Sequence, residues 1–502
     1  MTSLCSSVAW WARSEPNRIA LIYKDQRVSY AALQNRVEVV AAMLVERGIK
    51  PGNVVALLMK NSAAFVELAL AISYVGAVSL PINYRLAREE VAYIAEHGTA
   101  RLMFVDEELR GNAGGCEALV ALNASAQSDS RELARGLAPL KNGHASGPQD
   151  LFRLMYTSGT TDRPKGVTHS YENYAWKCFD HIAALGLSAD DRLLVVGPLY
   201  HVGAFDLPGL AVLQVGGMVA IQRDFDAQGA LAMIEAEKLT GGWMAPVMLD
   251  RVLALPGRER FDLSSFRWLV GGGERTPEQR IREFKTLFRE ARYVDAYGLT
   301  ETCSGDTMME AGRELEKIGS TGRALANVEI EIRNEEGRVL PSGQEGEICV
   351  RGPKVSAGYW RDEQKTRASF HGDWFRTGDI GYLDAEGFLF LTDRKKDMIL
   401  SGGENIASSE VERVLYQLPQ VAEAAVVGVA DERWGERVVA VVVLRDGESL
   451  SVEDVRSHCE GRLAGFKAPK QLVVVETLPR NPSGKVLKRA IRDRLAGERN
   501  AT

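Results

Sequence analysis

The segment from Tyr156 to Val167, YTSGTTDRPKGV, gathers hydroxyl groups, glycine and lysine within one short stretch of the chain. Hydroxyls, a mobile lysine and the backbone N–H groups that glycine leaves accessible are groups that bind a polyphosphate. The segment is not a Walker A loop, because that motif needs Gly before its Lys and Ser or Thr after it, whereas Pro164 and Gly166 stand there. Surface loops are also rich in Ser, Thr and Gly, so a phosphate site needs support from other motifs.

Five further motifs follow this segment along the chain, and each of them carries little information alone. They are Gly271-Gly-Gly-Glu274, Ala296-Tyr-Gly-Leu-Thr-Glu301, Trp374-Phe-Arg-Thr-Gly-Asp379, Ser401-Gly-Gly-Glu-Asn-Ile406 and Pro479-Arg-Asn-Pro-Ser-Gly-Lys485. Their order resembles the adenylate-forming superfamily, which includes acyl-CoA and aryl-CoA synthetases, luciferases and peptide-synthetase adenylation domains. The resemblance covers nearly the whole chain. The phosphate segment has one departure, Asp162, where family members usually carry glycine.

The resemblance implies a nucleotide site built from these motifs. Tyr297 is expected against adenine, Thr300 at the α-phosphate and Glu301 at Mg²⁺. Asp379 is expected to accept hydrogen bonds from the ribose hydroxyls, with Arg394 beside it. The expected ATP-binding residues are Thr157, Ser158, Gly159, Thr160, Thr161, Lys165, Gly273, Glu274, Ala296, Tyr297, Gly298, Asp379 and Arg394.

The C-terminal motifs imply that one site serves two half-reactions. Lys485 is expected to reach the carboxylate and the phosphate during adenylation. Lys396 falls at the family's hinge position, where a rotation would replace Lys485 with a second loop for thioester formation. The residues of that loop are Gly402, Gly403 and Glu404. The expected catalytic residues are Lys485, Thr300, Glu301 and His201, and the expected metal ligand is Glu301.

The implied activity is that of an AMP-forming acyl-CoA synthetase, which converts an acid, ATP and coenzyme A to acyl-CoA, AMP and pyrophosphate. ATP, Mg²⁺ and coenzyme A are therefore expected as cofactor and co-substrates. Three alternatives stay open at this point: a stand-alone adenylation domain that activates an acid for a carrier protein, a nucleotide-binding protein without catalysis, and a luciferase. The presence of both Glu301 and Lys485 argues against the non-catalytic alternative.

The acid is expected near Pro198-Leu-Tyr-His201, which resembles the family segment beside the substrate carboxylate. The expected acyl pocket consists of His201, Val202, Trp243, Gly271 and Gly272. These residues are mainly apolar or small, which suits a fatty or aromatic monocarboxylic acid. Amino-acid-activating relatives carry Asp directly after the residue that His201 matches. Here Val202 stands in that place, and Asp206 lies too far along the chain to replace it.

The elements that position these motifs follow from apolar periodicity, which alternates between helical and strand-like segments as in α/β proteins. Helices are expected over 30–47 and from Ala63 onward. The expected strands are 54–59, 102–105, 193–196, 218–221, 268–270 and 293–294. Several of these strands end beside the motifs, where α/β sheets bind ligands. We expect an α/β fold with a large N-terminal domain of mixed sheets flanked by helices and a small, mobile α+β C-terminal domain.

The charged stretch Asp393-Arg-Lys-Lys-Asp397 marks the expected domain boundary. An N-terminal domain over 1–393 would bind nucleotide and acid, and a C-terminal domain over 394–502 would move about a hinge near Lys396. In the smaller domain Ser409 and Glu412 predict a capping box. One face of the helix that follows carries Val411, Val414, Leu415 and Leu418. Strands are expected over 424–429, 438–444 and 472–475, and a second helix near 452–463.

Composition limits the partners of the protein. A formal net charge of -6 and a pI near 5.8 give no general reason to bind nucleic acid. Six scattered cysteines without a CxxC pair indicate reduced thiols in a cytoplasm, and the N-terminus lacks the pattern of a signal peptide. The most apolar stretch, 65–82, is too interrupted for a membrane helix and predicts a buried helix that runs into a strand. A homodimer is an assembly that the sequence leaves open.

Asp162 gives the first testable prediction. A carboxylate beside bound phosphates repels them, so we expect Asp162→Gly to tighten the apparent affinity for ATP or leave it unchanged. Titration of both proteins with ATP measures this. A marked weakening in the variant would instead assign Asp162 a positive role in the turn.

Overall fold

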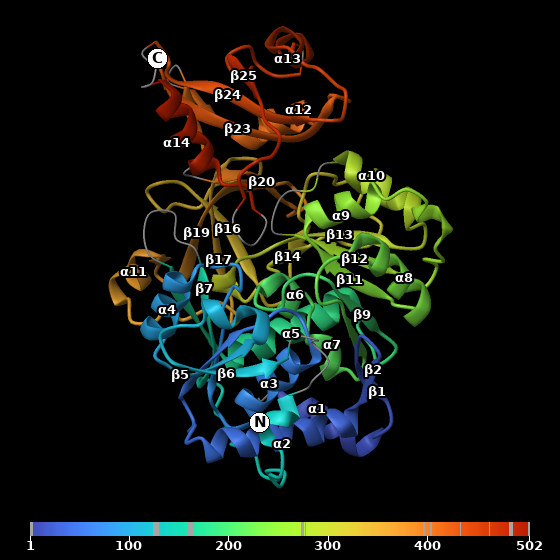
Figure 1. Ribbon diagram of the computed structural model, residues 1–502. Coiled ribbons are helices and arrows are strands. Elements are labelled where there is room, and N and C mark those ends of the chain that lie inside the picture. The colour runs from blue at the N-terminus through green and yellow to red at the C-terminus, as the bar shows by residue number, and fades with distance from the viewer. Residues whose placement is uncertain are drawn as a thin grey trace. The chain divides into compact units, whose positions relative to one another are not determined.

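The computed structural model resolves the chain into two compact units, coloured along the sequence in Figure 1. The first unit comprises residues 1–274, 282–329 and 350–375, and the second comprises 275–281, 330–349 and 376–502. The structure describes residues 4–123, 130–157, 164–272, 276, 278–394, 397–401, 404–431, 433–460, 462–480 and 485–499.

A nine-stranded sheet forms the larger of the two sheets in the first unit, with the strand order β15-β14-β13-β12-β11-β9-β10-β1-β2. The six strands from β13 to β1 in this order run parallel to one another. Their carboxyl ends therefore meet at one edge of the sheet. The strands are β1 (Ile19–Tyr23), β2 (Gln26–Ser29), β9 (Arg192–Val195), β10 (Met218–Ile221), β11 (Gly241–Met244), β12 (Trp268–Gly271), β13 (Arg292–Tyr297), β14 (Thr307–Met308) and β15 (Arg323–Ala324).

A six-stranded sheet with the order β6-β5-β3-β4-β7-β8 forms the second sheet of this unit. Its strands are β3 (Val54–Leu58), β4 (Val78–Pro81), β5 (Ala100–Asp106), β6 (Glu117–Leu122), β7 (Leu151–Thr157) and β8 (Lys165–Ser170). All neighbours are parallel except β7 and β8, which form an antiparallel hairpin. The turn of this hairpin carries the predicted phosphate segment.

Helices of the first unit begin and end at the expected types of residue. The hydroxyl of Ser29 accepts a hydrogen bond from the N–H of Ala32 at the start of α2, and Ser170 and Asn173 form a capping box on α5. Helix α3 is apolar and buried on all sides, which explains its lack of a polar face. The helices are α1 (Cys5–Ser14), α2 (Tyr30–Glu46), α3 (Ala63–Tyr74), α4 (Arg88–His97), η1 (Glu107–Asn112), η2 (Ser130–Ala134), α5 (Tyr171–Leu185), α6 (Val202–Asp206), α7 (Ala211–Gln214), α8 (Ala227–Glu237), α9 (Pro246–Leu253), η3 (Arg258–Arg260), η4 (Thr300–Thr302) and α11 (Glu363–Ala368), and α10 (Glu278–Leu287) spans a division between the units.

The second unit contains a sheet with the order β22-β21-β24-β23, in which β25 also pairs with β24. Apolar residues of α12 and α13 pack on one face of this sheet, and Ile491 and Leu495 of α14 pack on the other. Its elements are β21 (Ile399–Ser401), β22 (Glu404–Ile406), α12 (Ser408–Leu415), β23 (Val421–Asp431), β24 (Gly435–Leu444), α13 (Val452–Cys459), β25 (Gln471–Val474) and α14 (Lys488–Arg499).

A third sheet joins β16, β17, β19 and β18, with β20 paired to β19. The divisions between the two units fall within its strands β16, β17 and β19. Its strands are β16 (Glu329–Arg333), β17 (Gly346–Arg351), β18 (Phe370–His371), β19 (Trp374–Leu383) and β20 (Leu389–Arg394). The boundary expected at 393/394 and the hinge at Lys396 stay predictions, because Lys396 lies outside the described residues.

Every helix and strand named from the sequence is present, with ends shifted by a few residues. The α/β fold class with a large N-terminal and a small C-terminal part is confirmed. The capping box predicted for Ser409 and Glu412 is wrong, since α12 begins after Ala407 without a side-chain cap. Glu412 instead accepts a hydrogen bond from the N–H of Val426 (2.8 Å) and pairs with Lys488 (2.7 Å). The Glu412 carboxylate therefore makes tertiary contacts and is not used in a local capping box.

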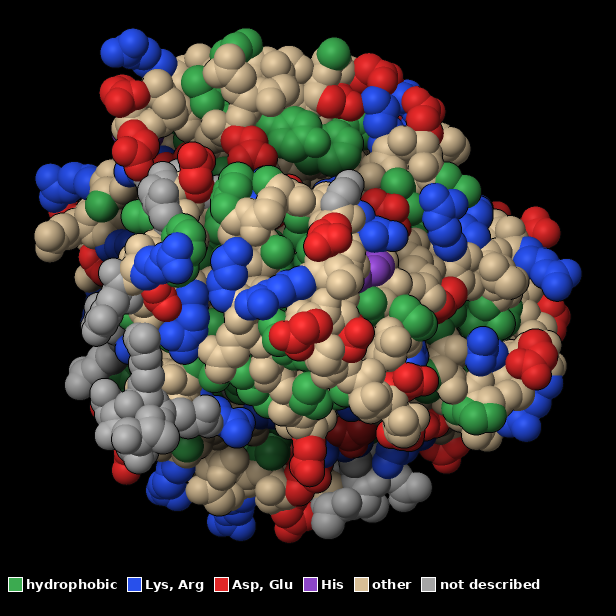
Figure 2. Space-filling model, turned by 90° about the horizontal axis from the view of Figure 1, so that it is seen from above, with side chains coloured by type: hydrophobic (Ala, Val, Ile, Leu, Met, Phe, Trp, Pro, Cys, Tyr) green, Lys and Arg blue, Asp and Glu red, His purple; other side chains and the backbone are tan. Residues whose placement is uncertain are grey.

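Within the described residues, no helix combines the length and the apolar character that crossing a membrane would require. The stretch 65–82 is instead the buried pair α3 and β4, as predicted. On the face in Figure 2, basic and acidic side chains lie among one another and among smaller apolar areas.

A chain of buried polar groups crosses the core of the first unit. The Arg153 guanidinium donates to the Asp206 carboxylate (Nη2–Oδ2, 2.7 Å) and to Nδ1 of His169 (3.0 Å), and Lys177 lies 3.5 Å from Asp206. Arginine only donates, so Nδ1 of His169 accepts and its Nε2–H donates to the Thr300 carbonyl oxygen (2.7 Å). Burial and the neighbouring Arg153 lower the pKa of His169 to about 3. The imidazole is therefore neutral at pH 7.

This network predicts a loss of stability in acid. Unfolded histidine titrates near pH 6.5, so the stabilisation due to neutral His169 is complete above pH 6.5 and is lost as the pH falls toward 3. Between pH 7 and pH 5 we expect the His169 contribution to the free energy of unfolding to fall by about 2 kcal/mol. Urea titrations of the wild type and of His169→Gln at both pH values measure it. Equal losses in the two proteins would contradict the prediction.

Candidate active site

The carboxyl edge of the nine-stranded sheet brings together the predicted acyl-pocket segments. Strand register places Val195, Trp243, Val270 and Val294 in one row across β9, β11, β12 and β13. The chain continues from this row into the predicted site residues, which are His201 after β9, Gly271 and Gly272 at the end of β12, and Ala296 and Tyr297 at the end of β13. Ligands of parallel α/β sheets bind at such an edge.

Trp243 fills the space that two glycines leave open. A Cβ at Gly197 would lie 2.3 Å from Cζ3 of its indole ring, and a Cβ at Gly203 would lie 2.4 Å from Cζ2. The ring of His201 stacks against the indole with centroids 6.3 Å apart. A Cβ at Gly272 would lie 3.8 Å from the indole Nε1. Trp243 is 6% exposed, so its packing fixes the shape of this part of the edge.

His201 has a structural role at the start of α6. Its Nδ1 accepts a hydrogen bond from the N–H of Gly203 (3.0 Å), which caps the helix and places the proton of the neutral ring on Nε2. Val202, the first residue of α6, is buried. At the end of β12, Gly271 cannot be replaced without displacing Tyr293, because an added Cβ would lie 1.7 Å from the Tyr293 hydroxyl oxygen.

The phosphate hairpin places Thr157 and Lys165 opposite each other at the ends of β7 and β8. The predicted residues of its turn, Ser158, Gly159, Thr160 and Thr161, and also Asp162, lie outside the described residues. The hairpin is tied to the segment before α11, because the N–H of Trp360 donates to the Gly166 carbonyl oxygen (2.7 Å) and the Thr168 hydroxyl donates to that of Gly358 (2.9 Å).

Thr300 and Glu301 lie in η4, directly after β13, and are tied to the same segment. The Tyr359 hydroxyl donates to Oε1 of Glu301 (2.9 Å), and the N–H of Ser356 donates to the Glu301 carbonyl oxygen (2.8 Å). The Thr300 carbonyl oxygen accepts from His169 on β8. Burial, together with the negative charge of Glu301, raises the pKa of Tyr359, so its hydroxyl keeps its proton. These contacts hold the predicted phosphate and metal residues in one neighbourhood.

Glu301 has the chemistry that Mg²⁺ needs. Protein sites usually bind this ion through one or two carboxylates, with substrate phosphates and water completing the coordination. Among the residues that the structure describes, no group of three His, Cys, Asp or Glu side chains could form a separate metal centre. A single oriented carboxylate therefore fits Mg²⁺ that arrives with a nucleotide.

The turn after β13 depends on close backbone contact. A Cβ at Gly298 would lie 2.3 Å from the Gly305 nitrogen, so glycine is needed there. Tyr297 is buried, and its carbonyl oxygen accepts from the N–H of Asp306 (2.6 Å). Cys303 in this turn has a left-handed backbone (φ 54°), and burial raises the pKa of its thiol to about 12. Cys303 is therefore a buried packing residue and not a thiolate.

Two carboxylates near the predicted acid pocket are already paired. Asp206 is fully buried against Arg153 and Lys177. Asp306 is fully buried and lies 2.9 Å from the ammonium group of Lys354. Neither carboxylate is placed to bind the ammonium group of an amino-acid substrate, which agrees with the Val202 position.

Further predicted site residues lie in the second unit. Asp379 on β19 and Arg394 on β20 are direct partners across the antiparallel pair. Glu404 opens β22 opposite Ser401, and Lys485 precedes the bridge residue Val486. The predicted residues Gly273, Glu274, Lys396, Gly402 and Gly403 lie outside the part of the chain that the structure describes.

Sequence motifs missed the residues that hold the site together. Arg153 and His169 flank the phosphate segment, yet their roles appear only in the buried network. Tyr359 lies in Ala357-Gly-Tyr-Trp360, a segment that was not singled out. The useful signal was a charged residue in an apolar strand, since Arg153 interrupts Leu151–Met155, and buried charges need partners.

Family models match both parts of the chain: an AMP-binding enzyme model over residues 8–360 and an AMP-binding enzyme C-terminal domain over 410–485. The chain is 37% identical to an indoleacetate–CoA ligase of Aromatoleum aromaticum over 491 residues, covering 96% of both chains.

Solved structures agree in fold over nearly the full length. An o-succinylbenzoate CoA synthetase from Bacillus subtilis in complex with its acyl-adenylate is 32% identical, with a TM-score of 0.85 and coverage of 97% and 98%. The same enzyme is known with ATP and a magnesium ion (TM-score 0.84, 32% identical, coverage 96% and 98%). An anthranilate CoA ligase in complex with anthranoyl-AMP has a TM-score of 0.91 at 26% identity, with coverage of 100% and 98%.

These matches cover both parts of the chain. The chain belongs to the AMP-binding enzyme family of adenylate-forming proteins, and it is an acid–thiol ligase of the acyl-CoA synthetase branch that uses ATP, Mg²⁺ and coenzyme A.

Proposed function

We propose that this ligase acts on a compact aromatic monocarboxylic acid. The observation that carries the proposal is the packing of Trp243 against Gly197 and Gly203, because a buried indole there limits the depth of the predicted acyl pocket and offers a flat apolar wall. Relatives are named for indoleacetate, ferulate and long-chain fatty acids, so both substrate classes occur at similar identity. A long alkyl chain that extended toward Gly197 and Gly203 would meet the Trp243 ring.

In the first half-reaction an oxygen of the acid carboxylate bonds to the α-phosphorus of ATP, and the bond to the pyrophosphate oxygen breaks. The approaching groups are both negative, so positive charge must be in place beforehand. Lys165 and Lys485 supply charge at the phosphates, and Thr300 contacts the α-phosphate. Tyr359 orients Glu301 through its 2.9 Å hydrogen bond. Mg²⁺ held by Glu301 neutralises phosphate charge when it is bound.

In the second half-reaction the coenzyme A thiolate attacks the acyl carbonyl carbon, and AMP leaves. The same carbon needs different neighbours in the two steps. Rotation at Lys396 would withdraw Lys485 and bring in the loop of Gly402, Gly403 and Glu404. In both steps Asp379 and Arg394 hold the ribose, a role that their direct pairing on β19 and β20 supports.

We also propose that the protein works in the cytoplasm. All six cysteines are free thiols and five of them are buried, which suits a reducing compartment.

Lys485→Ala separates the half-reactions. Loss of a positive group at the developing charge should lower the rate of acyl-AMP formation by about 100-fold or more. Thioester formation from supplied acyl-AMP should stay nearly unchanged, because Lys485 has by then left the site. Pyrophosphate release and coenzyme A acylation are measured separately, and an equal loss in both steps would rule out this role.

Trp243→Ala tests the acid class. We expect the variant to raise the ratio of kcat/KM for a long-chain acid to that for an aryl acid by about tenfold, since one or two methylene groups in an apolar pocket already change the ratio by that factor. The kcat/KM values of the wild type and the variant are measured as AMP release with a panel of acids in the presence of coenzyme A.

Trp268→Ala is the matched control. Trp268 is equally buried on the neighbouring strand, but its ring packs on Gly241 at the opposite end of β11. It should lower stability without changing the preference between acids. A wild-type enzyme that prefers long-chain acids, or a Trp243→Ala ratio that stays constant, would overturn the aromatic assignment.

A further inference from the structure

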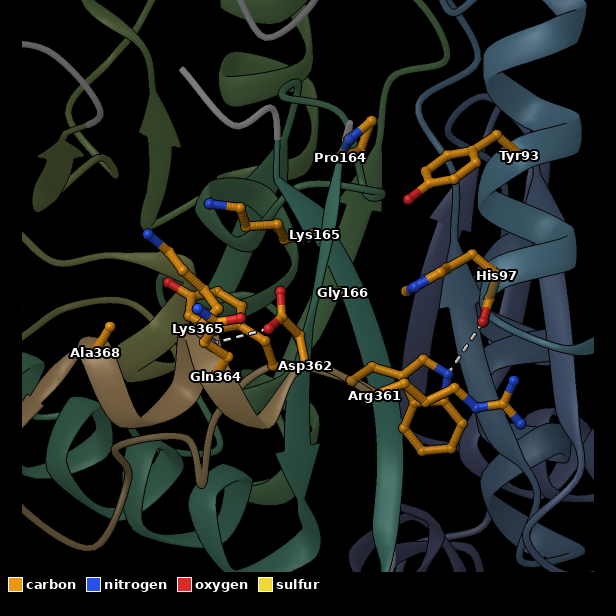
Figure 3. A pocket seen from close by; sticks show the side chains of 12 residues that line it. Tyr93, His97, Pro164, Lys165, Gly166, Arg361, Asp362, Gln364, Lys365 and Ala368 are labelled. Atoms are coloured by element: carbon orange, nitrogen blue, oxygen red, sulfur yellow. Dashed lines mark hydrogen bonds between the residues drawn. The ribbon is translucent and has the colours of Figure 1, made fainter. Parts of the chain in front are cut away.

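A groove of about 620 Å³ lies beside the phosphate hairpin in the first unit (Figure 3). One wall carries Tyr93 and His97 of α4, and the other is formed by α11 and the residues just before it. Lys165 and Gly166, at the start of β8, lie between the walls. The lysine of the phosphate segment is therefore part of the groove lining.

Positive charge dominates the lining of this groove. Lys165, Arg361 and Lys365 are its Lys and Arg residues, and Asp362 is its one carboxylate among the lining residues described. The Asp362 carboxylate is already engaged, since Oδ1 accepts a hydrogen bond from the backbone N–H of Lys365 (2.8 Å) at the start of α11. Three cations and one carboxylate give the groove lining an excess of positive charge.

Two of these cations have no acidic partner within the part of the chain described. Neither Arg361 nor Lys365 makes a salt bridge there, whereas Arg367, on the same helix, pairs with Glu363 (2.9 Å). Arg361 adopts a left-handed backbone (φ 55°), which is unusual for a residue with a long side chain. Its guanidinium lies over the Trp360 ring, 5.5 Å from the centroid. Because Trp360 also lines the groove, this contact places the Arg361 charge beside it.

We propose that the groove binds phosphate groups of a nucleotide substrate, with Lys365 and Arg361 as contact residues. The inference rests on the proposed function, because the ligase reaction supplies two phosphate-bearing substrates. One source is the pyrophosphate end of ATP, which Lys165 would share with the groove. The other is the nucleotide of coenzyme A, whose 3′-phosphate needs a cation and whose base can stack on aromatic rings. Both sources present the same chemistry to the two cations.

Direct binding tests the groove without any acid or turnover. Isothermal titration calorimetry with inorganic pyrophosphate, and separately with adenosine 3′,5′-bisphosphate, is carried out on the full chain and on Lys365→Met, Arg361→Met and the double variant. We expect each single change to weaken one of the two ligands by about fivefold to tenfold, the size of one charge-assisted contact at a partly exposed site. Lys365→Arg keeps the cation and should retain most of the affinity.

Arg367→Met is the matched control, because it removes an exposed cation from the same helix outside the groove. It should change neither affinity, and thermal unfolding of all variants shows whether they fold. Weakening for pyrophosphate assigns the groove to ATP, and weakening for the bisphosphate assigns it to coenzyme A.

Steady-state kinetics test independently whether the phosphate group that binds the groove belongs to ATP or to coenzyme A. A variant with a raised KM for coenzyme A but an unchanged KM for dephospho-coenzyme A would identify the 3′-phosphate as the ligand. If folded Lys365→Met and double variants bind both probes as tightly as the wild type, the groove proposal is overturned. A wild type that binds the probes but acylates coenzyme A preferentially with long-chain acids would refute the proposed aromatic substrate and leave the groove intact.

Discussion

A buried arginine in the core of the first unit constrains the positions of the residues that must pair with it. Arg153 is 1% exposed, and its guanidinium must find acceptors because desolvation of a charge is costly unless it is paired. Asp206 and His169 provide them, and removing one partner of a buried ion pair of this kind costs on the order of 3–5 kcal/mol. His169 also donates a hydrogen bond to the Thr300 carbonyl oxygen. One network therefore connects β7 and β8 of the six-stranded sheet to the segment that follows β13 of the nine-stranded sheet.

This network and a second contact hold η4, which carries Thr300 and Glu301, close to the phosphate hairpin. Tyr359 reaches Glu301 across 58 residues of sequence, while Trp360 and Gly358 hold β8. A carboxylate meant for a metal ion gains from such a donor, because the hydrogen bond fixes its orientation before the ion arrives. The site is thus prearranged by neutral and charged groups that do not themselves react.

Close packing around Trp243 and the open groove beside Lys165 represent opposite uses of space. At the acyl edge, glycines remove side chains so that one indole can fill the volume, and the result is a closed apolar wall. Beside the hairpin, long basic side chains border about 620 Å³ that the protein leaves unfilled. The first arrangement would select a ligand by shape and the second by charge, as the acyl and phosphate ligands proposed for them require.

The sequence by itself determined the α/β class and the approximate positions of the strands and helices named from it, because these depend on local periodicity. Its short ordered strings also supplied the candidate residues of the nucleotide motifs. It also named His201, Trp243 and Gly271 as acyl-pocket residues, and the parallel sheet has Trp243 and Gly271 near the carboxyl ends of β11 and β12 and His201 in the segment after β9. The roles of residues such as Ser158 and Lys396 stay predictions, since the described part of the chain does not include them.

Only the tertiary structure decided which side chains meet. Glu412 contacts Val426 and Lys488 instead of forming its predicted capping box, and Asp206 is the buried partner of Arg153. Such pairs join residues that are far apart in the sequence, so a local sequence pattern does not predict them. Their physical reason is burial, because a charged or polar group inside the protein takes whichever partner the packed chain brings within hydrogen-bond distance.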